Sequence, residues 1–221
     1  MDRFTPILVG YLKMFNVESV LSVAVGICVD IFEALGTKLV PYANDIMQVL
    51  MDCLRDGSVM RDIKPAVVAA FGDMAMAVQS AYEPYLSMTQ LLLMQASQQQ
   101  AESPDMLEFI NALRASVLEA YSGIVYGLDD GGRIDLLIRH NFITPMMQFL
   151  SFLANDTTKD EEVLKKAVVL VGDLARTIGH HPSAQLQQDY ILRLIRQGEA
   201  SQDEEVKNAA QFSLRHLRQL P

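Results

Sequence analysis

Carboxylates lie in the middle of three of the most apolar segments of this sequence. FGDMAMA (71–77) and VGDLART (171–177) each place an aspartate directly after a glycine, and VDIFEAL (29–35) carries the aspartate alone. Carboxylates on one exposed surface can bind the arginine and lysine side chains of a partner. In an apolar segment they can instead bond a neighbouring helix, because buried charges are normally paired. Glycine costs a helix interior about 1 kcal/mol, so its place here indicates a close approach between helices.

Helical periodicity covers nearly the whole chain of 221 residues, and no run of alternating apolar and polar residues predicts a strand. We expect ten helices that alternate between an outer and an inner series. The outer helices begin near Phe4, Pro41, Pro84, Phe142 and Ala184. The inner helices, which carry the carboxylates, begin near Val17, Met60, Pro104, Asp160 and Asp203.

The inner helices align on the glycine–aspartate motif and reveal a repeat. The aligned positions are 29–30, 72–73, 122–123, 172–173 and 212–213, at intervals of 43, 50, 50 and 40 residues. Two-helix units of about 40–47 residues are typical of HEAT repeats, whose hairpins stack to bury one continuous core. We therefore predict an all-α solenoid of about five HEAT repeats and ten main antiparallel helices. It forms a single domain over 1–221, with repeats at about 4–36, 41–81, 84–128, 142–179 and 184–220.

The aligned helices place carboxylates on the face that points away from the outer helices. In a stacked array this face lines the concave surface, and the residues expected there are Asp30, Glu33, Asp73, Glu119 and Asp173. Glu119 supplies the carboxylate of the third repeat, where Gly123 takes the place of the aspartate. The net charge of −9 favours a basic partner and argues against broad binding to nucleic acid. In the alternative interpretation, these carboxylates only bond neighbouring repeats and hold the stack together.

Four of the inner segments resemble the last repeats of the importin-β family of nuclear transport receptors. They are AVGICVDIFEAL (24–35), KPAVVAAFGDMAMAV (64–78), LRASVLEAYSGIVYGL (113–128) and VVLVGDLARTIG (168–179). The resemblance covers essentially the whole chain and corresponds to roughly the final quarter of the longer family protein. It implies a superhelix of HEAT repeats that carries cargo through nuclear pores, with a location in the cytoplasm, the nucleus and the nuclear envelope.

The resemblance also implies a partner for the acidic face. The C-terminal repeats of the family wrap the basic importin-β-binding segment of importin-α with their inner helices. The positions that would meet its arginines and lysines are Asp30, Glu33, Asp73, Glu119 and Asp173. Phe212 lies where the family often has a tryptophan, and its ring keeps stacking and part of the cation–π attraction.

The outer helices imply a second kind of partner. The family holds phenylalanine-glycine (FG) repeats of nucleoporins in shallow apolar pockets between adjacent outer helices. The candidate pocket residues are Leu91, Met94, Met146 and Phe149. In the alternative interpretation these residues are core, because each outer helix contacts its inner partner and two neighbours. The resemblance implies the GTPase Ran as a partner of the full-length receptor, mainly through repeats outside this segment.

No pattern in the sequence predicts an enzyme, a metal site or a bound cofactor. DDGGRID (129–135) lacks the alternating ligands of an EF-hand, and Cys28 and Cys53 lack the paired spacing of a zinc site. Two cysteines in apolar helical segments form no disulfide framework, which predicts a reducing compartment. The apolar run at 23–29 is too short to cross a membrane, so we expect no membrane insertion.

A different class of function fits the same predicted fold. A generic HEAT scaffold assembles a signalling complex without a role in transport, and it needs neither an acidic concave face nor outer apolar pockets. Binding of a basic importin-α segment separates the two functions.

Overall fold

The computed structural model describes residues 1–181 and 186–220, and this part of the chain contains helices and no β-strand. The outer helices are α1 (Thr5–Leu12), α3 (Val40–Arg55), α5 (Leu86–Ser97), α8 (Ile143–Asn155) and α10 (Asp189–Ala200). The inner helices are α2 (Glu18–Leu35), α4 (Lys64–Val78), α6 (Leu107–Asp130), α9 (Glu161–Ile178) and α11 (Glu204–Leu217). Short 3-10 helices connect them: η1 (Gly36–Leu39), η2 (Arg61–Ile63), η3 (Gln79–Tyr85) and η4 (Pro104–Met106).

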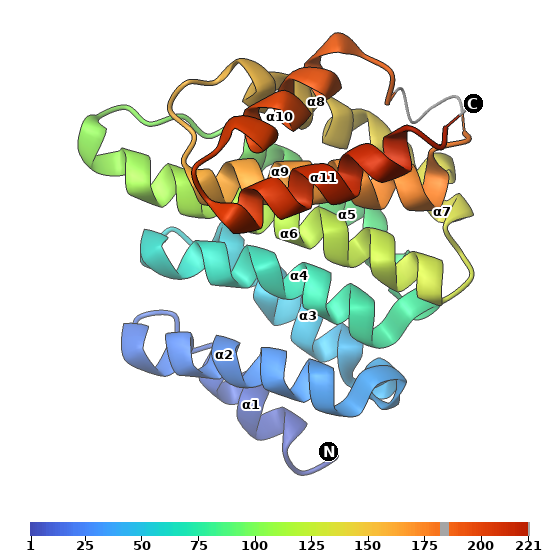
Figure 1. Cartoon of the computed structure of the whole chain (residues 1–221). Helices are drawn as coiled ribbons and strands as arrows, with labels where there is room; N and C mark the ends of the chain where they lie inside the picture. The colour runs from blue at the N-terminus through green and yellow to red at the C-terminus, as the bar shows by residue number, and fades with distance from the viewer. Residues whose placement is uncertain (182–185, 221) are drawn as a thin grey trace.

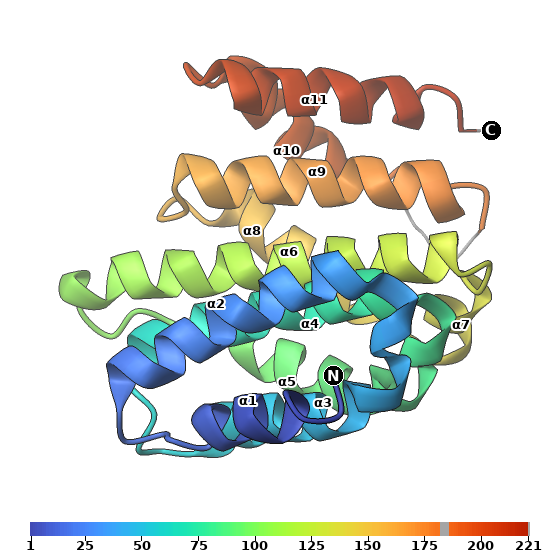
Figure 2. The same ribbon diagram turned by 90° about the horizontal axis from the view of Figure 1, so that it is seen from below.

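In the described residues, the helices form a stack of five antiparallel hairpins in two layers. Figure 1 shows the inner helices α2, α4, α6, α9 and α11 following one another across the molecule, with the two chain ends at opposite ends of the stack. Figure 2 shows α6, α9 and α11 lying side by side from a second direction. The predicted all-α solenoid is therefore confirmed, and the segment at 128–141 contains the short extra helix α7 (Asp135–Arg139).

The local sequence explains where the helices begin and end. The carboxylate of Asp160 accepts a hydrogen bond from the backbone nitrogen of Val163 at 2.9 Å and so caps the start of α9. Gly36, with a φ of 51°, ends α2 and turns the chain toward α3. The start of the last outer helix was predicted near Ala184, which lies outside the described residues, and α10 begins at Asp189.

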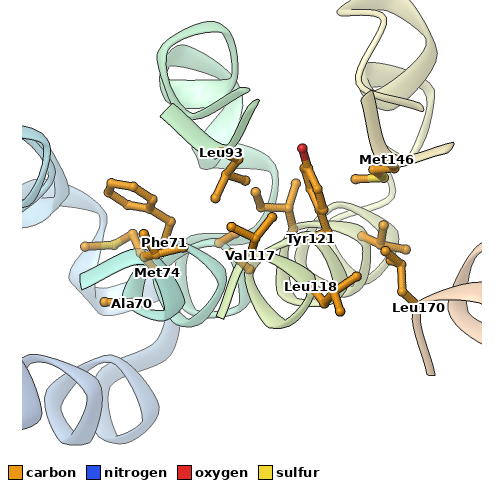
Figure 3. Close-up of a cluster of buried hydrophobic side chains, with 14 of the residues drawn as sticks. Ala70, Phe71, Met74, Leu93, Val117, Leu118, Tyr121, Met146 and Leu170 are labelled. Carbon is orange, nitrogen blue, oxygen red and sulfur yellow. The ribbon is translucent and has the colours of Figure 1, made fainter. Parts of the chain in front are cut away.

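One apolar core runs along the stack between the two layers. Figure 3 shows a part of it, in which Phe71 and Met74 from α4 approach Val117 and Tyr121 from α6. Met146 reaches the same cluster from α8 in the outer layer. No single hairpin could bury these side chains on its own, so each repeat depends on its neighbours for stability.

Glycines bring α4 and α6 into direct backbone contact. A Cβ atom placed on Gly123 would lie 2.6 Å from the Cα atom of Gly72, closer than real Cβ atoms approach. A Cβ atom on Gly127 would lie 2.1 Å from the carbonyl oxygen of Ala75. The sequence predicted a close approach at the glycines of the aligned motif, and the contact of Gly72 with Gly123 confirms it, whereas Gly127 lies outside that motif.

One helical run in the described part of the chain passes a simple test for a membrane span. The run Glu18–Arg55 contains an 18-residue window with a mean hydropathy of 1.8. The expectation of no membrane insertion considered only the shorter apolar run at 23–29, which lies inside this longer run. Core helices of soluble proteins and N-terminal signal sequences pass the same test. In the fold this run is divided by η1 into the two antiparallel helices α2 and α3.

Candidate partner-binding surface

Successive inner helices meet at the aligned motif, and the residues there differ from contact to contact. The first residue of each aligned pair points toward the next inner helix. Where this residue is glycine, the backbones come close: Gly72 meets Gly123 in α6, and Gly172 meets Ser213 in α11. At the other two contacts the first residue of the pair carries a side chain. Val29 faces the groove beside Asp73, and Ser122 lies beside Asp173. An aspartate in the next inner helix is therefore met by valine or serine, and not by glycine.

Asp173 does not line the acidic surface, which corrects the sequence prediction for this residue. Its side chain has a relative exposure of 0% and lies between α6 and α9. The hydroxyl group of Tyr126 on α6 donates a hydrogen bond to its carboxylate at 2.5 Å. Burial raises the pKa of Asp173, whereas this hydrogen bond and the charge of Arg176 lower it. The alternative interpretation, a bond between neighbouring repeats, is the one that holds at this position.

The side chains around Asp173 extend this bond into a small polar network. The guanidinium group of Arg176 lies 4.9 Å from the centre of the Tyr126 ring and 3.1 Å from the carboxylate of Asp129. The network joins α6 to α9 along one edge of their contact. A buried carboxylate is stable only with such partners, so these residues hold the two repeats together.

The contact between α2 and α4 is open and holds two carboxylates. A cavity of about 380 Å³ lies there, and Phe32 and Met76 are among its apolar lining residues. Glu33 and Asp73 line the same cavity, one from each helix. Val29 occupies the place that glycine takes in α4, and its side chain lines the cavity.

Asp73 is a half-buried carboxylate with a perturbed proton affinity. Burial raises its pKa to about 6, and the negative charges of Glu119 and Glu33 act in the same direction. The positive charge of Lys166 lowers the pKa and opposes them. A cation placed in the cavity beside Asp73 would favour the ionised form and lower its pKa.

Asp30, Glu33, Asp73 and Glu119 are solvent-accessible positions on the inner helices, and we call these four residues the acidic surface. Lys166 of α9 reduces the negative electrostatic potential of the acidic surface on the side of Glu119. The Lys166 ammonium group lies 3.2 Å from the carboxylate of Glu119 and 3.7 Å from that of Glu162. These are exposed ion pairs, which contribute little to stability.

Phe212 lies partly exposed on the last inner helix, α11. Its ring contacts the ring of His216 edge to face, with the ring centres 4.6 Å apart. Phe212 is 38% exposed, and its contact with a cation or an aromatic group of a partner stays a prediction.

The outer helices divide the predicted FG-pocket residues into two groups. Leu91 is 48% exposed and Met94 is half-buried, so both are accessible on α5. Met146 and Phe149 on α8 are buried in the core, and the prediction of an accessible pocket at these two residues was wrong. The Phe149 ring stacks on Phe152, with the ring centres 6.4 Å apart.

A cavity on the outer side was not predicted from the sequence. It has a volume of about 370 Å³ and lies between α3, α5 and the starts of α4 and α6. Leu54, Leu92 and Phe109 supply apolar walls, and the guanidinium group of Arg61 lies 5.7 Å from the centre of the Phe109 ring. These residues come from four segments, so no spacing within one helix could have revealed the cavity.

The groups that could perform other chemistry are buried or scattered. Burial raises the pKa of the Cys28 thiol to about 12 and that of the Cys53 thiol to about 11, which makes both poor nucleophiles at neutral pH. Within residues 1–181 and 186–220, no three histidine, cysteine, aspartate or glutamate side chains come together as metal ligands.

The stacked helical hairpins define an α-solenoid, a class of fold built from repeated units that pack on their neighbours. Residues 1–199 match the family model described as importin subunit beta-1-like, TPR repeats. The chain belongs to the importin subunit beta-1-like family. TPR units, like HEAT units, are helical hairpins, and the intervals of 40 to 50 residues in this chain are closer to the HEAT length.

Curated relatives match nearly the whole chain. It is 32% identical over 220 residues to importin subunit beta-1 of Arabidopsis thaliana, covering 96% of this chain and 25% of the relative. It is 30% identical over 223 residues to importin subunit beta-1 of Schizosaccharomyces pombe, covering 97% of this chain and 25% of the relative. The chain thus spans about a quarter of the length of the curated relatives it matches.

Solved structures have the same fold. A crystal structure of importin beta grown in ammonium sulfate superimposes with a TM-score of 0.89 at 25% identity, covering 99% of this chain and 26% of that chain. A structure of the Kap95:Nup1 complex superimposes with a TM-score of 0.85 at 25% identity, covering 98% of this chain and 26% of that chain. A structure of Kap95p bound to RanGDP gives a TM-score of 0.87 at 26% identity, covering 98% and 26% of the two chains.

Proposed function

We propose that this chain is a partner-binding part of a nuclear import receptor, and that its acidic surface binds the basic importin-β-binding segment of importin-α. The observation that carries the proposal is the cavity between α2 and α4, which is lined by the carboxylates of Glu33 and Asp73 together with the apolar side chains of Phe32 and Met76. The net charge of −9 and the membership of the importin subunit beta-1-like family support it.

The cavity has the two features that a lysine or arginine side chain requires. The long aliphatic stem of such a side chain packs on apolar surface, and its charged head seeks carboxylates at the opening. Glu33 and Asp73 approach from opposite helices, so one guanidinium group between them can donate hydrogen bonds to both. Ionisation of Asp73 then becomes favourable, because the new cation offsets the repulsion by Glu119.

The other two carboxylates extend the attraction beyond the cavity. Asp30 lies on α2 and Glu119 on α6, so the acidic surface crosses three successive inner helices. A basic helix or extended segment laid across these helices meets carboxylates at each step. Lys166 beside Glu119 weakens the potential at the far side, so the attraction is strongest over α2 and α4.

The outer surface is assigned to nucleoporin FG repeats in the same proposal. The accessible side chains of Leu91 and Met94 lie on the outer helix α5, and the cavity beside Phe109 lies between α3, α5 and the starts of the inner helices α4 and α6. The superimposed Kap95:Nup1 complex supports a nucleoporin partner. The RanGDP complex supports Ran as a partner of the full-length receptor, and both complexes support a location between cytoplasm and nucleus, at the pore.

A titration tests the importin-α part of the proposal. A labelled basic importin-β-binding peptide is titrated with the chain, and a peptide of the same length with its arginines and lysines replaced by glutamate is the control. The variant Asp30→Asn, Glu33→Gln, Asp73→Asn, Glu119→Gln should bind the basic peptide at least about tenfold more weakly. A matched variant neutralises four carboxylates of the outer helices: Asp45→Asn, Asp52→Asn, Asp189→Asn and Glu199→Gln.

The two variants carry the same net charge and so separate a local site from a general charge effect. Equal losses of affinity in both variants would show that only the overall charge matters. Absence of binding by the unchanged chain would favour the generic HEAT scaffold, which requires no acidic surface.

A further inference from the structure

Each inner helix presents one accessible side chain at the same position of the repeat. This position comes three residues after the second residue of each aligned pair, and we call its members the inner row: Glu33, Met76, Tyr126, Arg176 and His216. Three of them are exposed and two are half-buried, so a partner can reach all five. The helices that carry the row follow one another across the molecule in Figure 1.

The side chains of the inner row change character along the stack. The row begins with the carboxylate of Glu33 on α2 and continues with the apolar Met76 and the aromatic Tyr126. It ends with two basic side chains, Arg176 on α9 and His216 on α11. The inner surface is therefore acidic at one end of the row and basic at the other.

The residues around the two ends have the same polarity. α2 contains three acidic residues and no lysine or arginine. Residues 206–221 contain no acidic residue, and they carry Lys207, Arg215 and Arg218 in addition to His216. In the part of the chain that the structure describes, no carboxylate forms an ion pair with Arg215, His216 or Arg218. A chain with a net charge of −9 thus has a cationic region at the end of its inner layer.

Arg176 and His216 converge at the basic end of the row. Their charges both lower the pKa of the buried Asp173, so the two side chains flank the same carboxyl group. One nitrogen of Arg176 pairs with Asp129 at 3.1 Å, and its guanidinium group has further donors for a second carboxylate. Phe212 supplies exposed apolar surface beside His216, with the ring centres 4.6 Å apart.

We propose that the inner surface binds a segment whose two ends carry opposite charges, with basic residues over α2 and α4 and a carboxylate over α9 and α11, held by Arg176 and His216. The inference rests on the proposed function for the basic end, and it adds the acidic end and the direction in which the segment lies. Charge complementarity supports it, because the reversed segment would place like charges opposite each other at both ends.

The fold also sets the spacing between the two charged ends of the segment. Packed helices lie about 8–10 Å apart, so the two steps from α4 through α6 to α9 span about 20 Å. A helical partner rises about 1.5 Å per residue, so its basic and acidic groups should stand about 13 residues apart. Met76 and Tyr126 lie between the two ends, so the residues between the charged groups should be uncharged on the facing side.

Two synthetic peptides with the same arginine-rich end test the acidic end of the segment. One peptide carries a pair of glutamates about 13 residues beyond the arginines, and the other carries glutamines there. Both are titrated with the complete chain. The glutamate peptide should bind at least about threefold more tightly, because Arg176 and His216 contact its carboxylates. Its lower positive charge would otherwise weaken binding to a chain with a net charge of −9.

Variants of the chain locate this gain in affinity. Arg176→Gln with His216→Gln should remove the gain and leave binding of the glutamine peptide intact, which also shows that the variant is folded. His216→Gln alone should reduce the gain. The matched control is Arg139→Gln with His140→Gln, which removes the same two side-chain types at the end of α7 and should keep the gain.

The outcomes separate this inference from the proposed function. Equal affinity for the two peptides, or a gain that Arg176→Gln with His216→Gln keeps, overturns the inference and leaves the binding of a basic segment standing. Binding of neither peptide contradicts the proposed function, and the inference fails with it. A lower melting temperature of the double variant with an unchanged gain overturns the inference in favour of cations that only stabilise the carboxyl ends of α9 and α11.

Discussion

The hydroxyl group of Tyr126 on α6 lies 2.5 Å from the carboxylate of Asp173 on α9 and donates a hydrogen bond to it. This bond converts a carboxylate in an apolar helix into a link between two repeats. A buried carboxylate that loses a donor keeps its full desolvation cost, so the bond is worth more than an exposed one.

Replacing this tyrosine tests the link. Tyr126→Phe should destabilise the protein by about 1–3 kcal/mol, because Asp173 would lose its hydroxyl partner. Tyr11→Phe is the matched control, since Tyr11 is exposed on α1. Urea unfolding of both variants gives the comparison, and equal free energies of unfolding would show that the Tyr126–Asp173 bond does not hold the repeats together.

The raised pKa of Asp73 predicts a dependence of stability on pH. Its pKa is about 6 in the folded protein and about 4 in an unfolded chain, so the native state binds the proton more tightly. The stabilisation from this group is complete below pH 4 and is lost as the pH rises through 6. Asp73→Asn should therefore exceed the original protein in stability at pH 7, by about 1 kcal/mol after allowance for solvent screening.

The difference between the two proteins isolates this one group from the other titrating residues. Chemical unfolding at pH 7 and at pH 4 measures it, and the advantage of Asp73→Asn should disappear at the lower pH. An advantage of the same size at both pH values would mean that ionisation of Asp73 carries no cost in the folded state.

The glycine contact between α4 and α6 predicts opposite effects of one methyl group at two positions. Gly123→Ala should destabilise the protein by about 1–3 kcal/mol, because the new Cβ atom would lie 2.6 Å from the Cα atom of Gly72. Gly26→Ala in α2 has open space around its Cβ position and should stabilise by about 0.5–1 kcal/mol. Thermal melting of the two variants tests this, and a neutral Gly123→Ala would contradict the close approach of the helices.

The outer helices predict different results for two apolar residues. Met146→Ala should cost about 2–5 kcal/mol, because Met146 is fully buried. Leu91→Ala should change stability by less than about 0.5 kcal/mol, because Leu91 is exposed. If α5 holds FG repeats, Leu91→Ala should also weaken the nuclear magnetic resonance shifts caused by an FG peptide. A loss of stability at Leu91 comparable to that at Met146 would place Leu91 in the core.

The repeat architecture could be predicted from the sequence because it depends on local signals. The apolar period of the helices and the prolines and capping aspartates at their ends lie close together in the chain. The spacing of the glycine–aspartate motif then gave the order of the repeats. Asp160, for example, was expected to start an inner helix, and its side chain caps α9.

Whether each carboxylate is buried or exposed could not be predicted in this way, because that depends on the residue opposite it in the neighbouring helix. Asp73 and Asp173 have the same motif and the same register. Asp73 faces the open contact beside Val29, whereas Asp173 faces Ser122 and the Tyr126 hydroxyl group. Only the packing of α6 against α9 decides that the second carboxylate is buried.

The exposure of apolar residues on the outer helices could not be predicted from the sequence for the same reason. α8 is apolar around most of its circumference, so periodicity does not show which side chains its neighbours cover. Met146 and Phe149 are buried because α9 and α10 pack against α8. Leu91 and Leu92 are adjacent in sequence, yet the first is exposed and the second buried.

The central claim is that Glu33 and Asp73 form one site for a basic side chain, and the most direct measurement is the affinity of the importin-β-binding peptide for two variants. Glu33→Gln with Asp73→Asn should weaken binding at least about tenfold, or about 1.4 kcal/mol, while Asp173→Asn should leave the affinity unchanged, because its carboxylate is buried. An unchanged affinity in the double variant, or an equal loss in Asp173→Asn, would contradict the claim.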